Sequence, residues 1–495
     1  MTKKNLILAL LLMLLFIFTL TKTVQASPGD IEAPSDYLEN IKKFIHKEYQ
    51  PGVPDNLLNN GALNGIFNSL DIYTTLYSPS EAAGFFTELD GDYFGVGLII
   101  SKVGDFITVN KVIPDSPAAK AGVLAGDKIV SVDGINIVGL DLAKASSLIR
   151  GAEGTEATLI IFRPRYDVMT IKSERTQISM SPFEYEIKNG IVYIRMSSFT
   201  VNSGECFEKV LADVDEHKIT KIILDLRDNP GGELSAAIAV AQKLVPKGLI
   251  TSLDFKSPDK EDTRFYSTQE NTKYQLAVLV NGSSASASEI LAGAIQDTKA
   301  GVLVGTQTFG KSKVQSLIPI LTPEAFTKYK NTLQAEIVNA FDLINAYNIE
   351  PADEEIIGWA KITTGEYFTP NGRSIDSIGL APDFVVQDYQ PVNEIDIRYI
   401  DKFTQTTKPG LRDESTDVES AEKILKLLGY NIDRPDLILD ENTFETIKIF
   451  QEQHSLYPYG VLDYITQQTL DNELDKSIFE IDSQYTKALE LLKNE

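Results

Sequence analysis

The chain has 495 residues and a formal net charge of −24 at pH 7. That length exceeds the size of one hydrophobic core and predicts several domains. The acidity disfavours a nucleic-acid partner, whose phosphates would be repelled. Cys206 is the only cysteine, which excludes an intrachain disulfide and a thiolate cluster for zinc.

The first residues have the pattern of an export signal. Lys3 and Lys4 precede an apolar run over residues 6–20, and Val-Gln-Ala at 24–26 resembles a cleavage site. The apolar run is short for a membrane span. We therefore expect residues 1–26 to be a cleaved signal peptide, with a retained membrane anchor as the alternative. Either case places the rest of the chain outside the cytoplasm.

Residues 27–90 are expected to form an N-terminal helical region. Apolar residues recur at spacings of three and four from Leu38 to Ile45 and again from Leu63 to Leu70. Such helices can pack on a core or pair two subunits as a homodimer, and amphipathicity alone does not choose between these roles.

Residues 91–165 are expected to form a compact unit of short strands and two helices. Asp133-Gly134 is a strong signal for a hairpin turn. The expected strands cover 98–101, 106–113, 127–134 and 158–162, and the expected helices cover 116–122 and 140–151. This order of elements resembles a PDZ domain.

The PDZ resemblance implies that this unit binds the C-terminal tails of proteins or peptides. A glycine-containing turn can direct backbone N–H groups at a terminal carboxylate, while the following strand pairs with the peptide. The candidate peptide-binding residues are Phe94, Gly95, Val96 and Gly97. The alternative is that these glycines only shape a turn.

Residues 166–386 alternate apolar strands with helices, which predicts a mixed α/β core with crossover helices. Helix-like spacing over 321–358 interrupts this alternation as an insert. Residues 387–416 have the composition of a linker. The fold expected for the whole chain is therefore multidomain α+β, with the PDZ-like unit inserted beside a mixed α/β core.

Residues 417–475 predict three helices and resemble a bacterial peptidoglycan-binding domain, and residues 476–495 predict a helical tail. The matching positions are Leu425, Leu428, Gly429, Tyr430, Thr443, Ile447, Phe450, Gln451, Leu456, Gly460, Asp463, Thr466 and Leu470. Most of them are core or turn positions. The resemblance implies a cell-wall partner without identifying a sugar contact.

Two motifs follow apolar strands and carry candidate catalytic groups. SSASASEIL at 283–291 places a serine where a strand gives way to a helix, whose N-terminus favours developing negative charge. DLRDNPGGEL at 225–234 holds Gly231 and Gly232, whose amides can approach a substrate closely. One of these amides, with that of Ala287, could bind an oxyanion. Helix capping and an ordinary glycine turn are the structural alternatives.

A third motif, GKSKVQ at 310–315, supplies a candidate base. Histidine usually deprotonates a serine nucleophile, but His46, His217 and His454 all lie outside these motifs. Lys311, Lys313 and Gln315 share one face of an expected strand, so the spacing does not choose between the lysines. A lysine base must be neutral, which requires burial to lower its pKa.

Together these motifs, with YFTPNGRSI at 367–375 and GLAPD at 379–383, make residues 35–386 resemble the C-terminal processing peptidases, a family of PDZ-containing serine proteases. The resemblance implies Ser286 as the nucleophile, Lys311 as the base, Gln315 as its orienting partner, an oxyanion hole of Gly231 or Gly232 with Ala287, and Asp297 in a supporting role. No metal or cofactor is expected.

The resemblance implies an extracytoplasmic endopeptidase that recognises and cleaves C-terminal tails, with gating by the PDZ domain and attachment to the cell wall. Two departures stand out: Ser312 replaces the usual glycine after the lysine, and the 321–358 insert lies beside the dyad. The alternative function is a wall-tethered, peptide-binding scaffold with an inactive protease core. A histidine-dependent hydrolase would require His217 to lie beside Ser286.

Overall fold

The computed structural model describes residues 36–113, 115–163, 168–258, 260–270, 272–403, 405 and 407–494. The signal segment expected at 1–26 lies outside the described residues. The chain divides into two units, Met1–Ile72 and Tyr73–Glu495. Across the described ranges, no helix combines the length and apolarity needed to cross a bilayer.

The first unit contains the two expected helices, α2 (Tyr37–Glu48) and α3 (Asp55–Asn68). Neither helix has a buried residue. Their large apolar side chains are exposed instead, among them Leu38, Phe44 and Leu57. These helices therefore form no core of their own.

The PDZ-like unit has the expected strands and helices. Its sheet has the order β3-β4-β5-β7-β8, with β6 paired to β5. The elements are β3 (Leu98–Val103), β4 (Phe106–Val112), α5 (Pro117–Lys120), β5 (Lys128–Val132), β6 (Ile135–Asn136), α6 (Leu142–Ile149), β7 (Glu156–Phe162) and β8 (Met169–Glu174). The predicted turn is present, because Asp133 and Gly134 both have positive φ between β5 and β6.

A two-stranded ribbon precedes and follows this unit in sequence. Strand β2 (Asp92–Gly95) pairs antiparallel with β9 (Thr176–Ser179). Helix α4 (Pro79–Asp90) leads into β2, and a capping box between Ser78 and Glu81 fixes its start.

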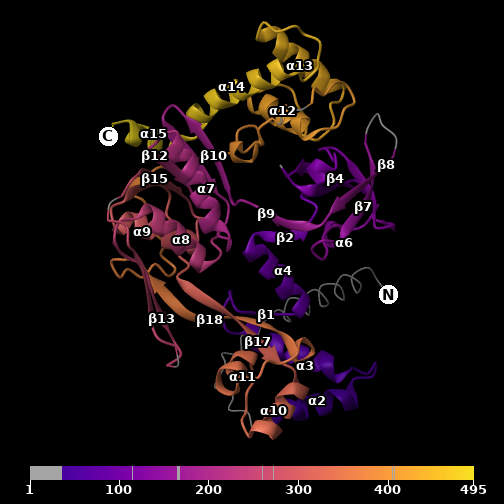
Figure 1. Cartoon of the computed structure of the whole chain (residues 1–495), viewed down its shortest axis with the longest axis vertical. Helices are drawn as coiled ribbons and strands as arrows, with labels where there is room; N and C mark the ends of the chain where they lie inside the picture. The colour runs from indigo at the N-terminus through magenta and orange to yellow at the C-terminus, as the bar shows by residue number, and fades with distance from the viewer. Residues whose placement is uncertain are drawn as a thin grey trace, which may run out of the picture. The chain divides into compact units, whose positions relative to one another are not determined.

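The protease-like core is built on a six-stranded sheet of order β10-β11-β12-β15-β16-β19, in which only β10 runs antiparallel to its neighbour (Figure 1). The strands are β10 (Phe183–Lys188), β11 (Ile191–Met196), β12 (Lys221–Asp225), β15 (Gln275–Val280), β16 (Gly301–Gly305) and β19 (Phe384–Val385). The crossover helices are α7 (Ser203–Glu216), α8 (Leu234–Leu244) and α9 (Ala287–Asp297). The predicted α/β alternation is confirmed.

Helices cover both faces of this sheet, because alternate residues of each buried strand point to opposite sides. Ile222 and Leu224 belong to the cluster that contains α7, α8 and α9. Ile223, between them, belongs to the cluster that contains the last helix, α15 (Ser483–Asn494). Helix α15 therefore covers one face of the core sheet.

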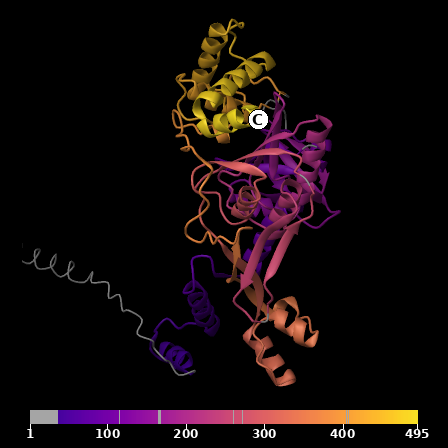
Figure 2. The ribbon, with the colours of Figure 1, turned by 90° about the vertical axis from the view of Figure 1, so that its left-hand side faces the viewer.

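A second sheet carries the expected insert. Its order is β1-β18-β13-β14, with β17 paired to β18. The strands are β1 (Thr75–Tyr77), β13 (Gly248–Phe255), β14 (Thr263–Ser267), β17 (Lys313–Leu321) and β18 (Ile356–Phe368). Helices α10 (Pro323–Leu333) and α11 (Ala340–Tyr347) join β17 to β18, and Figure 2 shows them in orange at the end of that hairpin.

The C-terminal module has the three expected helices, α12 (Thr416–Leu427), α13 (Glu441–Gln453) and α14 (Tyr464–Ile481). Two features differ from expectation. Part of the 387–416 segment is packed, because Ile395, Ile397 and Phe403 join the module's core. Helix α14 continues across the boundary expected at 475–476, since Leu474 is packed in that same core.

Candidate active site

Three loops meet at one edge of the core sheet because they follow three neighbouring parallel strands. The loop after β12 holds the two glycines, the loop after β15 holds Ser286, and the loop after β16 holds Lys311. The sheet topology thus converts three motifs distant in sequence into one candidate site.

Ser286 lies on a sharp turn with φ 56° and ψ −116°. Positive φ is uncommon for a residue with a Cβ, and such strain costs on the order of 1–3 kcal/mol unless the surroundings impose it. Helix α9 starts at the next residue, Ala287. The serine is therefore presented at a helix N-terminus, where backbone amides favour negative charge.

Glu289 links the backbone of Ser286 to that of Lys311. One carboxylate oxygen accepts hydrogen bonds from the Ser286 and Lys311 N–H groups, each at 2.9 Å. The other accepts from Gly310 N–H at 2.7 Å and from Thr308 Oγ1 at 2.6 Å. Burial raises the pKa of Glu289 above its ordinary value, although these four hydrogen bonds oppose the shift.

Tyr367 links the same two residues from the other sheet. Its buried hydroxyl lies 3.0 Å from the Ser286 carbonyl oxygen and 2.5 Å from the Lys311 carbonyl oxygen. Neither Glu289 nor Tyr367 was selected from sequence. The capping-box spacing Ser286-x-x-Glu289 was a usable local signal for Glu289. Tyr367, on β18, is the first residue of the 367–375 motif, but no local spacing indicates its contact with the two loops.

The two glycines occupy different positions. A Cβ on Gly231 would lie 2.9 Å from both Ser286 Cβ and Ala287 N, so this backbone touches the serine turn. A Cβ on Gly232 would lie 2.1 Å from the Phe199 carbonyl oxygen. Both have positive φ, so both positions require glycine.

The Gly231 amide already has an acceptor within its own loop. Its N–H donates to Asn229 Oδ1 at 2.9 Å, and Asn229 Nδ2 donates to the Met196 carbonyl at 2.9 Å. This buried asparagine therefore fixes the glycine loop to the end of β11, a role that the sequence did not reveal.

The two lysines of the third motif have different surroundings. Lys311 Nζ lies 4.6 Å from the centroid of the Tyr73 ring. Lys313 Nζ forms ion pairs with Glu366 at 3.3 Å and Asp376 at 3.1 Å. Burial alone would lower the pKa of Lys313, but hydrogen bonds with Asp376 and Glu366 outweigh it and raise that pKa. Lys313 is thus held in its charged form.

Gln315 lies on β17, where its Nε2 donates to Thr363 Oγ1 at 3.3 Å. Ser312 is buried, and its hydroxyl donates to Glu366 at 3.0 Å. The departure from glycine at this position therefore adds a contact outside the serine turn.

Asp297 lies at the opposite end of α9 from Ser286, about 16 Å along an eleven-residue helix. Its carboxylate accepts from Asn371 N–H at 3.0 Å and pairs with Arg373 at 2.5 Å. The structure does not bring Asp297 to the serine; it places Asp297 as an anchor for the 369–374 loop.

The three histidines have other partners. His46 bonds to Asp55 in the first unit, and His217 Nδ1 lies 2.9 Å from the Asp213 carbonyl at the end of α7. His454 stacks on Phe450 in the C-terminal module. These contacts do not support a histidine base for Ser286.

The candidate tail-binding segment differs from the expected turn, because Phe94 and Gly95 belong to strand β2 and only Val96 and Gly97 join it to β3. Strand β3 is the edge of its sheet, and α6 packs against it. Val96 is fully buried, while Phe94 is 41% exposed. A Cβ on Gly97 would lie 2.2 Å from Ser116 Cβ, so only glycine fits there.

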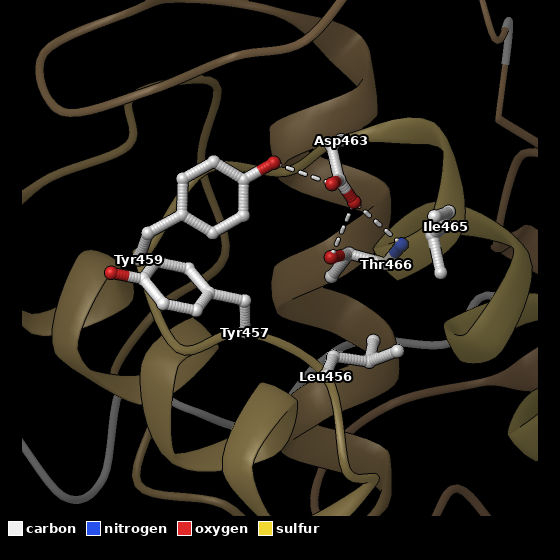
Figure 3. Close-up of a pocket in the computed structure, with 6 residues that line it drawn as sticks. All are labelled: Leu456, Tyr457, Tyr459, Asp463, Ile465 and Thr466. Carbon is white, nitrogen blue, oxygen red and sulfur yellow. Dashed lines mark hydrogen bonds between the residues drawn. The ribbon is translucent and has the colours of Figure 1, made fainter.

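The C-terminal module has an open pocket of about 200 Å³ with an aromatic rim. Tyr457 and Tyr459 lie with ring centroids 5.7 Å apart, and Ile465 lines the pocket beside them (Figure 3). Tyr457 is 79% exposed. Asp463 accepts from Thr466 and from the Tyr459 hydroxyl, so its carboxylate fixes the pocket's shape.

Three parts of the chain match known family models. Residues 190–386 match the model described as peptidase family S41, residues 108–163 match the PDZ domain model, and residues 414–470 match a peptidoglycan-binding domain model. The matched ranges fall in the core, the unit containing β4 to β7, and the C-terminal module.

Whole proteins of similar sequence carry names that refer to carboxy-terminal processing. The carboxy-terminal-processing protease of Bartonella bacilliformis is 33% identical over 371 residues, covering 72% of this chain and 75% of that protein. The carboxy-terminal processing protease CtpA of Bacillus subtilis is 29% identical over 475 residues, covering 95% and 92%. Among solved structures, a photosystem II D1 C-terminal processing protease is 24% identical with a TM-score of 0.38, covering 70% and 86%.

Proposed function

Because the chain belongs to peptidase family S41, the family of the carboxy-terminal processing proteases, and is a serine peptidase, we propose that Ser286 and Lys311 form its catalytic dyad. The observation that carries this proposal is the double link from Glu289 and Tyr367, which joins the two residues' backbones. Lys313, held by two carboxylates, is a poor candidate for the base.

In the proposed mechanism, neutral Lys311 takes the proton of Ser286 Oγ as that oxygen attacks the carbonyl carbon of the scissile bond. The resulting oxyanion is stabilised by the amides of Gly232 and Ala287. We assign Gly232 rather than Gly231 because Asn229 already accepts the Gly231 N–H. The lysine then protonates the leaving amine, and water hydrolyses the acyl-enzyme.

Gln315 is proposed to orient Lys311 by a neutral hydrogen bond. It lies on β17, four residues after Lys311, and its amide is held by Thr363. A neutral amide suits this role because a carboxylate would favour the charged lysine. Asp297 is proposed to act indirectly, by fixing the 369–374 loop through Arg373 and Asn371.

The substrate is proposed to be the C-terminal tail of a protein, delivered by the PDZ domain. The segment 94–97, which joins the end of β2 to β3, would receive the terminal carboxylate, and the edge of β3 would pair with the tail in a groove alongside α6. Tail occupancy of this groove would gate access to Ser286.

This proposal predicts that cleavage depends on a free terminal carboxylate. An unfolded protein with an apolar tail should be cleaved at least about tenfold faster than the same protein with an amidated C-terminus, because the amide lacks the charge that the segment receives. Mass spectrometry with the chain lacking residues 1–26 measures both rates, with Ser286→Ala as the blank.

Equal rates for the two substrates would contradict tail recognition while leaving the dyad intact. Absence of cleavage for both would instead favour the alternative function, a wall-tethered peptide-binding scaffold.

The C-terminal module is proposed to hold the enzyme at peptidoglycan outside the cytoplasm. A homodimer is proposed through α2 and α3, whose apolar side chains are exposed.

We propose that the aromatic pocket of the module contacts the sugar rings of peptidoglycan. Exposed aromatic faces offer an apolar surface with polar edges, which suits a sugar ring. Tyr457→Ala should reduce co-sedimentation with insoluble peptidoglycan at least about fivefold, the effect of losing a central aromatic anchor. Ile449→Ala, at a 48% exposed apolar side chain on α13 that does not line the pocket, is the control. Equal binding by both variants would exclude this pocket as the site that contacts the sugar rings.

A further inference from the structure

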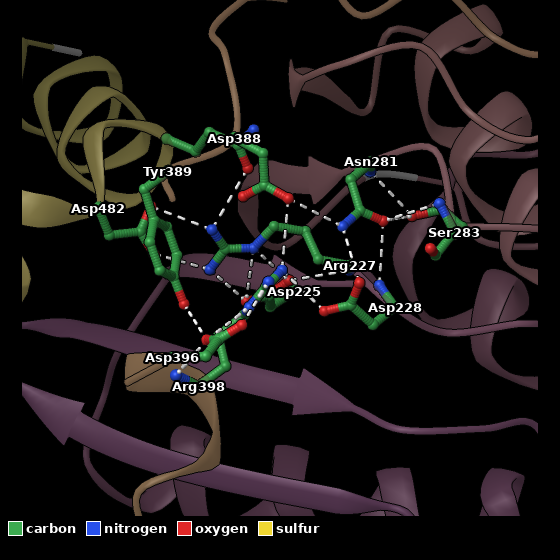
Figure 4. A network of polar contacts seen from close by, with 12 residues as sticks. Asp225, Arg227, Asp228, Asn281, Ser283, Asp388, Tyr389, Asp396, Arg398 and Asp482 are labelled. Atoms are coloured by element: carbon green, nitrogen blue, oxygen red, sulfur yellow. Dashed lines mark hydrogen bonds and ion pairs between the residues drawn. The ribbon is translucent and has the colours of Figure 1, made fainter. Parts of the chain in front are cut away.

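Two consecutive residues of the loop that holds Gly231 and Gly232 form ion pairs, the first as the cation and the second as the anion. Arg227 Nη2 lies 2.8 Å from Asp482 Oδ2, and Asp228 Oδ2 lies 2.7 Å from Arg398 Nη1. Figure 4 shows both pairs within one polar network. Arg227 and Asp228 directly precede the segment that holds Gly231.

Both partners belong to the connections of the C-terminal module. Arg398 lies in η2 (Ile397–Tyr399), on the segment that leads from β19 into the module. Asp482 lies at the joint between α14 and α15, where the chain returns from the module to the core. The module is therefore attached to the glycine loop at both of its ends.

The Arg227–Asp482 pair is buried, the Asp228–Arg398 pair is partly buried, and both have additional partners. Arg227 and Asp482 are both 3% exposed, and Arg227 also bonds to Asp225 and to Gln484 Oε1 at 3.3 Å. Arg398 also pairs with Asp396 at 2.8 Å. Without the Asp482 carboxylate, Arg227 keeps Asp225 as a charged partner but loses its ion pair to the end of the module, so the buried guanidinium and the backbone beside it must adjust.

The path from these pairs to the reacting groups is short. Asp228 has a positive φ of 60°, a conformation that its surroundings must impose. Its N–H donates to Asn281 Oδ1 at 3.1 Å, at the start of the loop that leads to Ser286. The next residue, Asn229, accepts the Gly231 N–H. A shift at 227–228 would therefore move the proposed oxyanion donors against the serine turn.

We propose that Asp482 and Arg398 are positioning residues for the oxyanion hole, so that the C-terminal part of the chain supports catalysis as well as wall attachment. This inference rests on the proposed role of Gly232. Helix α14 connects the aromatic pocket to the Arg227–Asp482 pair. Its first turn lines the pocket, and its last residue directly precedes Asp482, so the two ends of the helix lie about 27 Å apart.

The test is steady-state kinetics on a fluorogenic tail peptide with the chain lacking residues 1–26. Asp482→Asn and Arg398→Gln should each lower kcat about tenfold and change KM by less than about twofold, as expected for loss of transition-state contacts alone. Asp482→Glu and Arg398→Lys, which keep the charges, should recover part of kcat. A purely structural role would instead lower the folded fraction in thermal unfolding without this kcat–KM split.

The matched control is Asp475→Asn, which breaks the ion pair from α14 to Lys188 on β10. Its kcat should stay within about twofold of wild type, as for other half-exposed pairs. If Asp482→Asn does not fold, Gln484→Met removes the neutral acceptor of Arg227 and should lower kcat about threefold.

Unchanged kcat in the Asp482 and Arg398 variants, or in Gln484→Met, would overturn the inference, as would an equal loss in Asp475→Asn. Wild-type cleavage with unaffected variants would refute only this inference. Failure of the wild type to cleave would refute the proposed function on which it rests.

Discussion

Lys311→Ala should lower kcat at least about 1,000-fold, because Ser286 would lose the group that removes its proton. Lys313→Ala should lower kcat less than about threefold. Its ion pairs with Glu366 and Asp376 are partly exposed and contribute little to stability. Cleavage of a tail peptide by both variants, at matched enzyme concentration, measures the difference.

The comparison is informative because the two residues are the same amino acid and lie only two positions apart. Thermal unfolding of each variant controls for misfolding. Equal losses of kcat would show that the 310–315 segment needs its lysines for structure rather than for proton transfer, and the assignment of Lys311 would fail.

Glu289→Gln should reduce kcat about 10- to 100-fold, through loss of alignment between the nucleophile and the base. The carboxylate accepts four hydrogen bonds with two oxygens. A glutamine keeps the shape but has only one accepting oxygen, so two donors lose their acceptor. KM for the tail peptide should change little, because the proposed tail groove lies in the PDZ domain.

Glu324→Gln is the matched control, since Glu324 is an exposed carboxylate in the first turn of α10. It should retain wild-type kcat. Wild-type kcat in Glu289→Gln would mean that the Ser286 and Lys311 loops hold their geometry without the shared carboxylate.

Much of the site could be predicted because its motifs are local. Each motif follows an apolar strand, and parallel strands bring their following loops to one edge. The structure places the loops that hold Ser286, Lys311 and the two glycines at one such edge. The choice of Ser286 and Lys311 within their motifs came from the family resemblance. Gly231 and Gly232 were selected for the close approach of their amides, and both also have positive φ.

The contacts that join these loops could not be predicted, because they connect distant segments. Tyr367 reaches Ser286 and Lys311 from another sheet, and Asp482 reaches Arg227 across 255 residues. Helix α15 has an ordinary amphipathic pattern, which does not show that it covers the core sheet. Composition also described 387–416 as a linker, although Ile397 and Phe403 are buried there.

The central claim is that Ser286 and Lys311 act as one catalytic unit. The most direct test compares Ser286→Ala, Lys311→Ala and the double variant in cleavage of an unfolded protein with an apolar tail. Groups that act together are not additive, so the double variant should be no slower than the slower single variant. A double variant whose loss equals the product of the single losses, or a Ser286→Ala variant that retains cleavage, would contradict the dyad.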